Sequence, residues 1–151
     1  MISRVGRKPS ISQFFLGEMS KSSQRRWIIQ MIETSRIYNP PKGNGVRILV
    51  DRLWPRGLSK ENAKVDLWIK EIGPSNELRR WFGHDPKRWP GFKARYFQEL
   101  EGKKELVDQI IEIARAKDVI LLYGAKDIAH NNAIALREYL EAKENTNAKS
   151  T

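Results

Sequence analysis

The chain contains no cysteine. Disulfide bonds, thiolate nucleophiles and cysteine-ligated zinc or iron–sulfur centres are therefore excluded, and the composition is typical of a reducing compartment. Only two histidines are present, His84 and His130, and they lack the spacing of a helical metal site. The sequence therefore predicts no metal and implies no cofactor.

Long hydrophobic runs are also missing. No apolar run approaches the roughly 20 residues that cross a bilayer. The basic N-terminus carries a short apolar patch at residues 14–16, which is too short for the core of a secretion signal. We therefore expect a cytoplasmic protein that does not enter a membrane.

The chain has 151 residues, 40% of them hydrophobic and 30% charged, which fits one globular domain. Residues 1–26 show no sustained period and predict a basic, disordered tail. Residues 27–141 predict an α/β domain, and residues 142–151 a polar C-terminal tail. A start of the protein at Met19 or Met31 stays open as an alternative.

The net charge of +10 is concentrated in two segments. Residues 1–27 carry six Lys and Arg residues against one Glu, and residues 79–96 carry six against one Asp. Because the remainder is nearly neutral, the positive charge forms two local features rather than a uniform coat.

Apolar runs predict three strands. Residues 46–50 form a β-branched run, and the unbroken run 119–123 is expected in the interior of a sheet. Residues 27–38 predict a strand with ragged ends. The residues between 27–38 and 46–50 are too few for a helical crossover, so these two strands are either antiparallel or not adjacent.

Apolar residues at helical spacing predict the helices. Ser75 is expected to cap a short helix that ends at Phe82, followed by a loop over residues 83–91. If residues 124–132 form only an ordinary capped helix, Asp127 is the expected cap. The apolar faces of the three longer helices are Phe92, Tyr96, Phe97 and Leu100; Leu106, Val107, Ile110, Ile111 and Ala114; and Ala133, Leu136, Tyr139 and Leu140.

Residues 59–72 fit two patterns. Val65, Leu67 and Ile69 alternate as in a strand. Val65, Trp68, Ile69 and Ile72 instead share one face of a helix, and we favour the helix. Gly73-Pro74 would end it.

These elements predict a small single-domain α/β sandwich, with a short and partly parallel sheet flanked by helices. In such sheets, ligands bind beyond the carboxyl ends of the strands. The rule points to residues 51–57 and 124–132, which each follow a buried strand.

Residues 51–57 place an acid, two guanidiniums and an indole in one loop. Arg52 and Arg56 could bind a carboxylate or phosphate bidentately, and Trp54 could shield the site. Asp51 could orient the arginines or act as a base. The alternative is structural, with Asp51 paired to one arginine and Trp54 in the core.

Residues 124–132 have the strand–loop–helix arrangement that presents free N–H groups to an anion. Lys126, Asn131 and Asn132 would add charge and hydrogen bonds. The segment lacks the glycine pattern of a P-loop, and an ordinary capped helix is the alternative. His84 is a second catalytic candidate beside Asp51, or a residue that orders its loop.

The first functional hypothesis is therefore a phosphate- or nucleotide-type anion site at the strand ends. Whether the protein is an enzyme stays open. The hypothesis predicts that the anion-binding residues converge on one concave surface. They are Arg52, Trp54, Arg56, Lys126, Asn131 and Asn132.

The second hypothesis is a nucleic-acid-associated protein. Residues 79–96 interleave basic and aromatic side chains, which suits phosphate contacts with base stacking. The alternative is a helix whose rings belong to the core and whose charges are solvated. The basic candidates are Arg79, Arg80, Lys87, Arg88 and Lys93.

The tail carries an aliphatic residue three positions before a Phe-Phe pair. This pattern resembles the peptide that binds DNA sliding clamps such as PCNA, with Ile11, Phe14 and Phe15 at the anchor positions. Lys8 departs from that motif, which prefers glutamine there. A third hypothesis is a protein-interaction domain without catalysis.

The chain resembles the YeaO-like family, a group of unknown function. The string Val-Asp-Arg-Leu-Trp-Pro-Arg-Gly at residues 50–57 carries the resemblance, with further matches across residues 31–141. The resemblance implies a compact α/β fold and no established reaction. More distant relatives carry a Cys-His-Arg step where this chain has residues 130–132, His-Asn-Asn, so thiol chemistry is absent there.

Overall fold

The computed structural model describes residues 3–4, 31–39 and 43–150. The residues of the clamp-binding resemblance, Ile11, Phe14 and Phe15, lie outside the described residues, as does most of the predicted tail. Ser3 and Arg4 form a two-residue strand. The α/β class predicted from the sequence is confirmed.

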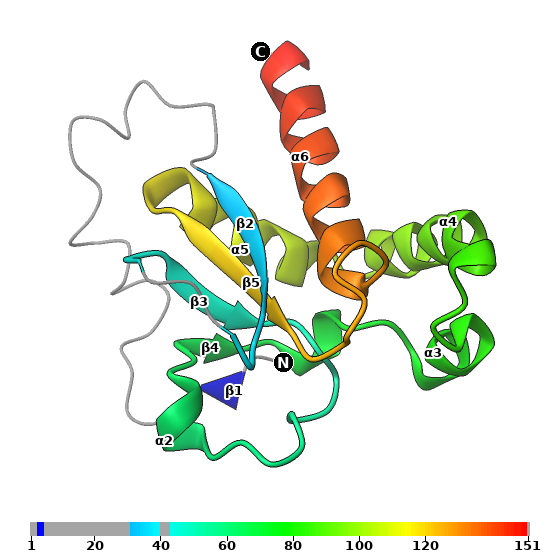
Figure 1. Cartoon of the computed structure of the whole chain (residues 1–151). Helices are drawn as coiled ribbons and strands as arrows, with labels where there is room; N and C mark the ends of the chain where they lie inside the picture. The colour runs from blue at the N-terminus through cyan, green and yellow to red at the C-terminus, as the bar shows by residue number, and fades with distance from the viewer. Residues whose placement is uncertain (1–2, 5–30, 40–42, 151) are drawn as a thin grey trace.

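The described strands lie side by side in one mixed sheet (Figure 1). Its order is β1-β4-β3-β5-β2. Strands β2 to β5 run parallel, and β1 pairs antiparallel with β4 at the edge. The strands are β1 (Ser3–Arg4), β2 (Ile32–Arg36), β3 (Val46–Leu49), β4 (Leu67–Trp68) and β5 (Val119–Tyr123).

Strand β5 lies between β3 and β2 and pairs with both. Every residue of β5 is buried, as expected for an interior strand. Strands β2 and β3 are not neighbours, because β5 separates them. One of the two arrangements predicted from their short connection is therefore the one observed.

The helices follow the predicted apolar periods, with two shifted ends. The cap of α6 is Asn131, whose Oδ1 accepts from the N–H of Ile134, and not Asp127. The predicted loop at residues 83–91 contains a 3-10 helix and the start of α4. The helices are α2 (Lys60–Ala63), η2 (Lys70–Ile72), α3 (Asn76–Phe82), η3 (Pro86–Arg88), α4 (Trp89–Glu101), α5 (Lys104–Ala116) and α6 (Asn132–Ser150).

The C-terminal residues 142–150, expected as a polar tail, continue α6. Glu144 is buried there and accepts two hydrogen bonds of 2.8 Å from the guanidinium of Arg115 on α5. The two helices are therefore joined by a bidentate ion pair beyond the sheet.

The helix favoured for residues 59–72 is wrong. This segment forms α2, then β4, then η2. Val65, Leu67 and Ile69 are buried, so the alternating pattern was the correct one. Pairing of Leu67 with Ile48 and Trp68 with Leu49 overrides the helical period, because it completes the sheet.

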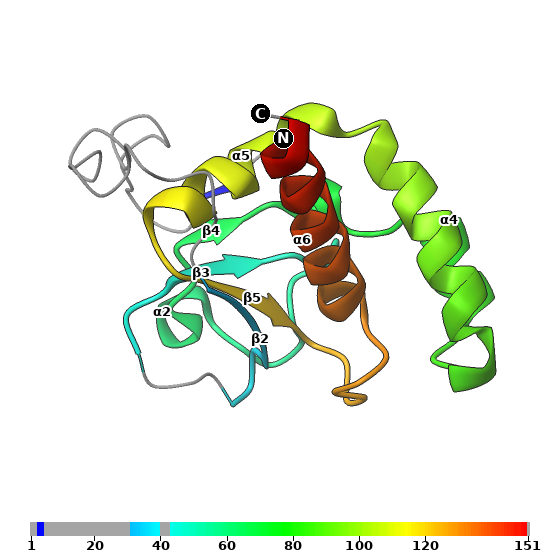
Figure 2. The same cartoon turned by 90° about the horizontal axis from the view of Figure 1, so that it is seen from above.

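The two faces of the sheet carry separate apolar clusters. Alternate residues of β5 divide between them, with Leu121 in the larger cluster and Leu122 in the smaller. Figure 2 shows α4, α5 and α6 on one side of the sheet and α2 on the other. Trp54 and Trp68 cover the smaller cluster, with ring centroids 5.3 Å apart.

Within the described residues, no helix is both long and apolar enough to cross a membrane.

Gly73 closes the chain onto the end of β3. A methyl group on Gly73 would lie 2.9 Å from the backbone nitrogen of Arg52 and 3.1 Å from the carbonyl oxygen of Val50. Arg52 in turn donates to the carbonyl oxygen of Gly73 at 2.8 Å. This close approach fixes where the residues after β3 leave the sheet.

We expect Gly73→Ala to lower the free energy of unfolding by about 1–3 kcal/mol, because backbone atoms must move to accept the methyl group. Urea unfolding measures the change. Gly43→Ala is the control, since no atom lies within 4 Å of the added carbon. Equal stability of the two variants would contradict the close approach.

Candidate functional site

A cavity of about 520 Å³ opens where β3 and β5 end. Three parts of the chain form it: the residues after β3, the residues from Gly124 to the start of α6, and the helices α3 and α4. The lining residues are Asp51, Arg52, Leu53, Pro74, Asn76, Arg79, Arg80, Phe82, His84, Phe92, Gly124, Ala125, His130, Asn131 and Asn132.

Asp51 joins the two strand ends. Its Oδ2 accepts the backbone N–H of Gly124 at 2.8 Å. A methyl group on Gly124 would lie 3.2 Å from that oxygen, so glycine permits the close contact. The side chain of Asn132 donates to Asp51 and, at 3.0 Å, to the carbonyl oxygen of Val50. The first turn of α6 is thereby fixed to the end of β3.

Burial raises the pKa of the Asp51 carboxyl above its ordinary value of 3.8. The hydrogen bonds from Gly124 and Asn132 oppose this, as do the more distant charges of Arg79 and His84. Among the described residues, no cation lies within ion-pair distance of Asp51. The Asp51 carboxyl therefore lines the cavity with no cation in contact with it among these residues.

Arg52 does not pair with Asp51. Its Nε donates to the carbonyl oxygen of Pro74 at 3.0 Å, and its Nη2 donates to that of Gly73 at 2.8 Å. The Lys103 ammonium also donates to the carbonyl oxygen of Gly73, at 3.1 Å. Burial lowers the pKa of this ammonium, and the positive charge of the nearby Arg52 lowers it further. The partners of Arg52 are neutral, so its charge remains available at the cavity.

Helix α3 supplies Arg79 and Arg80. Ser75 caps the helix as predicted, accepting from the N–H of Leu78 at 3.1 Å. The Ser75 hydroxyl also donates to Glu99 of α4 at 2.6 Å, which holds the start of α3 against α4. Both arginines are exposed, and Arg79 donates to Asn76 at 2.8 Å.

His84 lines the cavity in a left-handed backbone conformation, with φ of 57° directly after Gly83 at 54°. Histidine adopts this region more often than most residues, yet two consecutive positive φ values are uncommon. The ring centroids of His84 and Phe82 lie 6.2 Å apart. His84, the second catalytic candidate predicted from the sequence, is exposed and lines the same cavity as Asp51.

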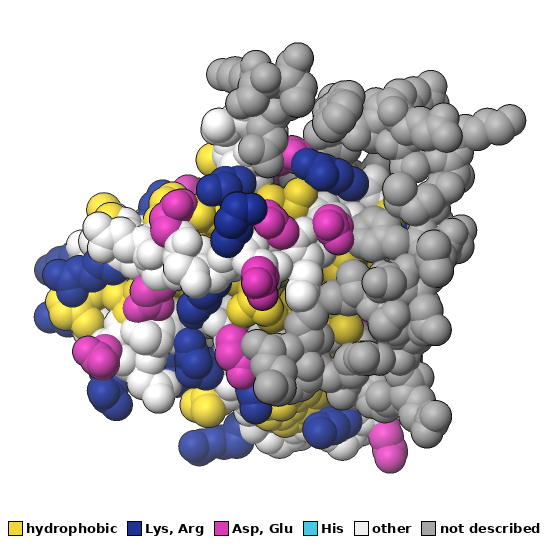
Figure 3. Space-filling model, turned by 180° about the vertical axis from the view of Figure 1, so that it is seen from behind, with side chains coloured by type: hydrophobic (Ala, Val, Ile, Leu, Met, Phe, Trp, Pro, Cys, Tyr) yellow, Lys and Arg dark blue, Asp and Glu magenta, His cyan; other side chains and the backbone are white. Residues whose placement is uncertain are grey.

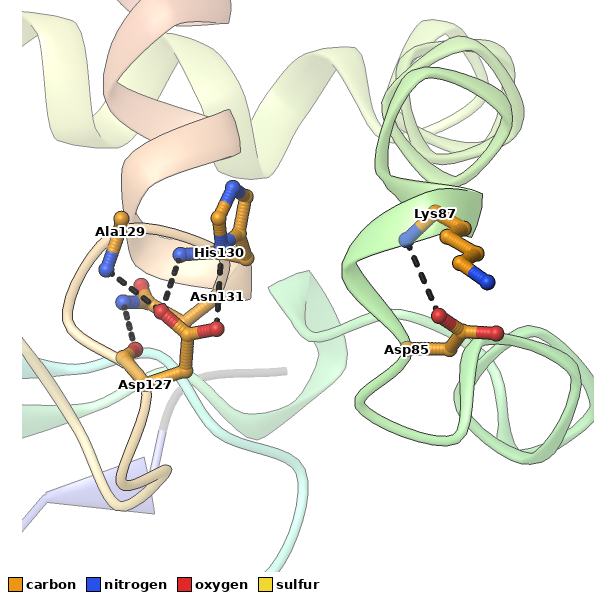
Figure 4. A network of polar contacts seen from close by, with 6 residues as sticks. All are labelled: Asp85, Lys87, Asp127, Ala129, His130 and Asn131. Carbon is orange, nitrogen blue, oxygen red and sulfur yellow. Dashed lines mark hydrogen bonds and ion pairs between the residues drawn. The ribbon is translucent and has the colours of Figure 1, made fainter.

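The loop before α6 is ordered by Asp127 (Figure 4). Its carboxylate accepts from the N–H groups of Ala129 and His130 and contacts the His130 ring at 3.0 Å. The N–H of Ala129 is the main cause that lowers the Asp127 pKa. Asn131 donates to the Asp127 carbonyl and caps α6, so both ends of its amide serve the fold.

Three predicted anion-binding residues do not line the cavity. Trp54 packs on the opposite face of the sheet and donates to the carbonyl oxygen of Leu58 at 2.6 Å. Arg56 and Lys126 are exposed. The structure therefore brings together Arg52, Asn131 and Asn132 from that set.

The rings of residues 79–96 belong mainly to the core. Phe82, Phe92 and Tyr96 are buried, and the Phe82 and Phe92 rings stack with centroids 4.5 Å apart. The guanidinium carbons of Arg88 and Arg95 each lie over the Trp81 ring, 5.4 and 4.0 Å from its centroid. The three buried rings are therefore not displayed on the outer surface, where the bases of a nucleic acid strand would stack, although Phe82 and Phe92 contribute to the cavity lining.

The basic side chains of this segment remain at the surface. Figure 3 shows Lys and Arg side chains at the end of the molecule that carries α3 and α4. Lys87 is exposed, and its N–H is the one that Asp85 caps in Figure 4. Arg88 contacts Asp85 at 3.9 Å, and Lys93 pairs with Glu138 at 3.0 Å. None of these three lysines and arginines lines the cavity.

Sequence patterns missed Asn76, Phe82 and Phe92 as cavity residues. Helical spacing places the two rings in the core, but it gives no sign that they also face a ligand-sized space. In the part of the chain that the structure describes, no three His, Asp or Glu side chains cluster closely enough to hold a metal ion.

The fold and cavity define a small α/β protein with a polar site at the ends of parallel strands. The profile described as "Inactive DUF488-N3 subclade" matches residues 31–151, and the chain belongs to this YeaO-like family of unknown function. It is 38% identical over 112 residues to the uncharacterized protein YeaO of Escherichia coli K12, covering 74% of this chain and 97% of that protein.

A second relative is the uncharacterized protein Rv3073c of Mycobacterium tuberculosis H37Rv. It is 31% identical over 113 residues, which cover 74% of this chain and 95% of that protein. No solved structure gave a significant match to the chain.

The raised pKa of Asp51 predicts a defined pH dependence of stability. A carboxyl with a raised folded-state pKa binds protons more readily when folded, so its ionisation costs stability. We expect wild type to lose stability relative to Asp51→Asn as pH rises from 3.8 through the folded-state pKa, with a constant difference above it.

Urea unfolding of both proteins at several pH values measures this difference. Asp108→Asn is the matched control, because Asp108 is a partly exposed carboxylate on α5 that lies outside the cavity and pairs only with the exposed Lys104 among the described residues. Its free energy of unfolding should change by no more than about 0.5 kcal/mol. A stability difference between wild type and Asp51→Asn that stays constant across the pH series, or that moves in the opposite direction, would contradict a raised Asp51 pKa.

Proposed function

We propose that the cavity binds a small anionic ligand of phosphate or nucleotide type, without catalysing a reaction. One observation carries the proposal: Arg52, Arg79 and Arg80 all line one cavity, and none of them forms an ion pair with a described residue. Uncompensated arginines at a cavity favour binding of a carboxylate or phosphate, whose oxygens match the guanidinium fork.

The position and size of the cavity support a ligand site. It lies beyond the carboxyl ends of β3 and β5, where ligands bind in parallel sheets. Its volume of about 520 Å³ falls within the roughly 300–1,000 Å³ that is typical of small-molecule sites. His84 and Asn76 add polar groups to the same lining.

Binding is favoured over catalysis for two reasons. The matching family is described as an inactive subclade. The residues 130–132, His-Asn-Asn, contain no thiol nucleophile, and His130 is engaged with Asp127. Asp51 and His84 therefore contribute charge and hydrogen bonds to the ligand in this proposal.

The nucleic-acid hypothesis has less support, because the rings that would stack on bases are buried. Lys93 is paired, and Arg88 is engaged with Trp81 and Asp85. The sliding-clamp prediction rests on Ile11, Phe14 and Phe15 and stays a prediction. Capture of a sliding clamp by wild type and by Phe14→Ala plus Phe15→Ala tests it.

We expect Arg79→Ala plus Arg80→Ala to weaken binding of a nucleoside monophosphate about tenfold or more, since two guanidinium contacts are lost. Isothermal titration calorimetry measures the Kd. The control is Lys60→Ala plus Lys104→Ala, which removes the same charge from exposed positions outside the cavity.

The control should bind within about twofold of wild type. An equal loss in both double variants would indicate a general charge effect and would rule out a specific site at α3. A single-stranded oligonucleotide that binds more tightly than the mononucleotide would favour the nucleic-acid hypothesis instead.

A further inference from the structure

We propose that the cavity takes a nucleoside 5′-phosphate with its base against Asp51 and its phosphate against Arg79 and Arg80. This inference rests on the proposed anion site and deepens it, because it adds which end of the ligand lies where.

The floor of the cavity offers hydrogen-bond acceptors. An ionised carboxylate has about four acceptor positions, and Asp51 receives donors only from Gly124 and Asn132 among the described residues. The Asn132 side-chain amide donates its N–H groups to Asp51 and to the carbonyl oxygen of Val50, so its oxygen can still accept a hydrogen bond from a ligand. A ligand group that lies here must bring donors.

The same floor disfavours the anionic end of a ligand. Asp51 has no ion-pair partner among the described residues, so in its ionised form it would repel a phosphate placed directly beside it. Arg79 and Arg80 instead belong to α3, a separate element on the exposed side of the cavity. The ligand is therefore bipolar, with a donor-bearing end and an anionic end.

Aromatic rings beside the floor favour a flat donor-bearing group. Phe82 and Phe92 line the cavity and stack at 4.5 Å. Phe92 also contacts Tyr96, with ring centroids 5.7 Å apart. The nearby Asp51 charge is one of the causes, after burial, that raise the pKa of the Tyr96 hydroxyl. A base whose exocyclic amine reaches a carboxylate between apolar walls fits this combination.

The size of the cavity excludes a phosphate ion as its full occupant. About 520 Å³ lies within the range for ligands of nucleotide size. A phosphate at Arg79 and Arg80 would leave the space down to Asp51 unfilled. The nucleoside supplies the group that fills it.

The experiment compares Asp51→Asn with wild type by calorimetry, using inorganic phosphate, ribose 5-phosphate and adenosine or guanosine 5′-monophosphate as probes. Asparagine keeps the shape of Asp51 but removes its charge and halves its acceptor oxygens. Urea unfolding of Asp51→Asn, as described for the pH series, shows that the variant is folded. Asp108→Asn is the matched control.

We expect Asp51→Asn to weaken binding of at least one of the two nucleotides about tenfold or more, to the level of ribose 5-phosphate. Binding of phosphate and ribose 5-phosphate should stay within about twofold, as should every probe with Asp108→Asn. Unchanged binding of both nucleotides to Asp51→Asn would overturn the inference. If Asp51→Asn weakens ribose 5-phosphate as much as it weakens the nucleotides, the inference is also overturned, because Asp51 would then contact the sugar and not the base.

The two proposals fail separately. Phosphate and nucleotide binding that survives Arg79→Ala plus Arg80→Ala would overturn the anion site. In that case adenosine and guanosine, which carry no phosphate, test Asp51 by themselves. If wild type binds these nucleosides and Asp51→Asn does not, the contact between Asp51 and the base is supported. If both proteins bind them equally, or if wild type does not bind them detectably, the contact is overturned.

Discussion

The hydrogen bond from the Gly124 N–H to the Asp51 carboxylate is the contact on which the site depends. It joins the ends of β3 and β5 at 2.8 Å, and glycine is the residue that allows the approach. Asn132 extends the same junction to the first turn of α6. One side chain therefore connects both strand ends and the start of the helix at the cavity.

The charges of Asp51 and Arg52 remain separate because the Arg52 guanidinium finds its hydrogen-bond partners elsewhere. Its guanidinium bonds to the carbonyl oxygens of Gly73 and Pro74 rather than to the neighbouring Asp51. An ion pair between these adjacent residues would have cancelled both charges. The cavity instead combines the Asp51 carboxyl with basic side chains from the β3 end and α3, and the proposed orientation of the ligand rests on this arrangement.

The loop at residues 51–57 serves both faces of the sheet. Asp51 and Arg52 line the cavity, whereas Trp54 crosses to the smaller apolar cluster and packs on Trp68. Trp68 donates to the Asp51 carbonyl at 2.8 Å. This loop, which lies within the range matched by the family, therefore combines residues of the cavity with residues that hold the fold.

Local patterns in the sequence determined the α/β class, the interior position of residues 119–123 and the Ser75 cap, because burial and capping depend mainly on neighbours along the chain. Only the tertiary structure decided the rest. Pairing with β3 made residues 67–68 a strand instead of part of a helix. Packing of α3 against α4 brought Arg79, Arg80 and Phe92 to Asp51, and the sheet carried Trp54 to the other face. These outcomes depend on contacts between distant residues, which no local period records.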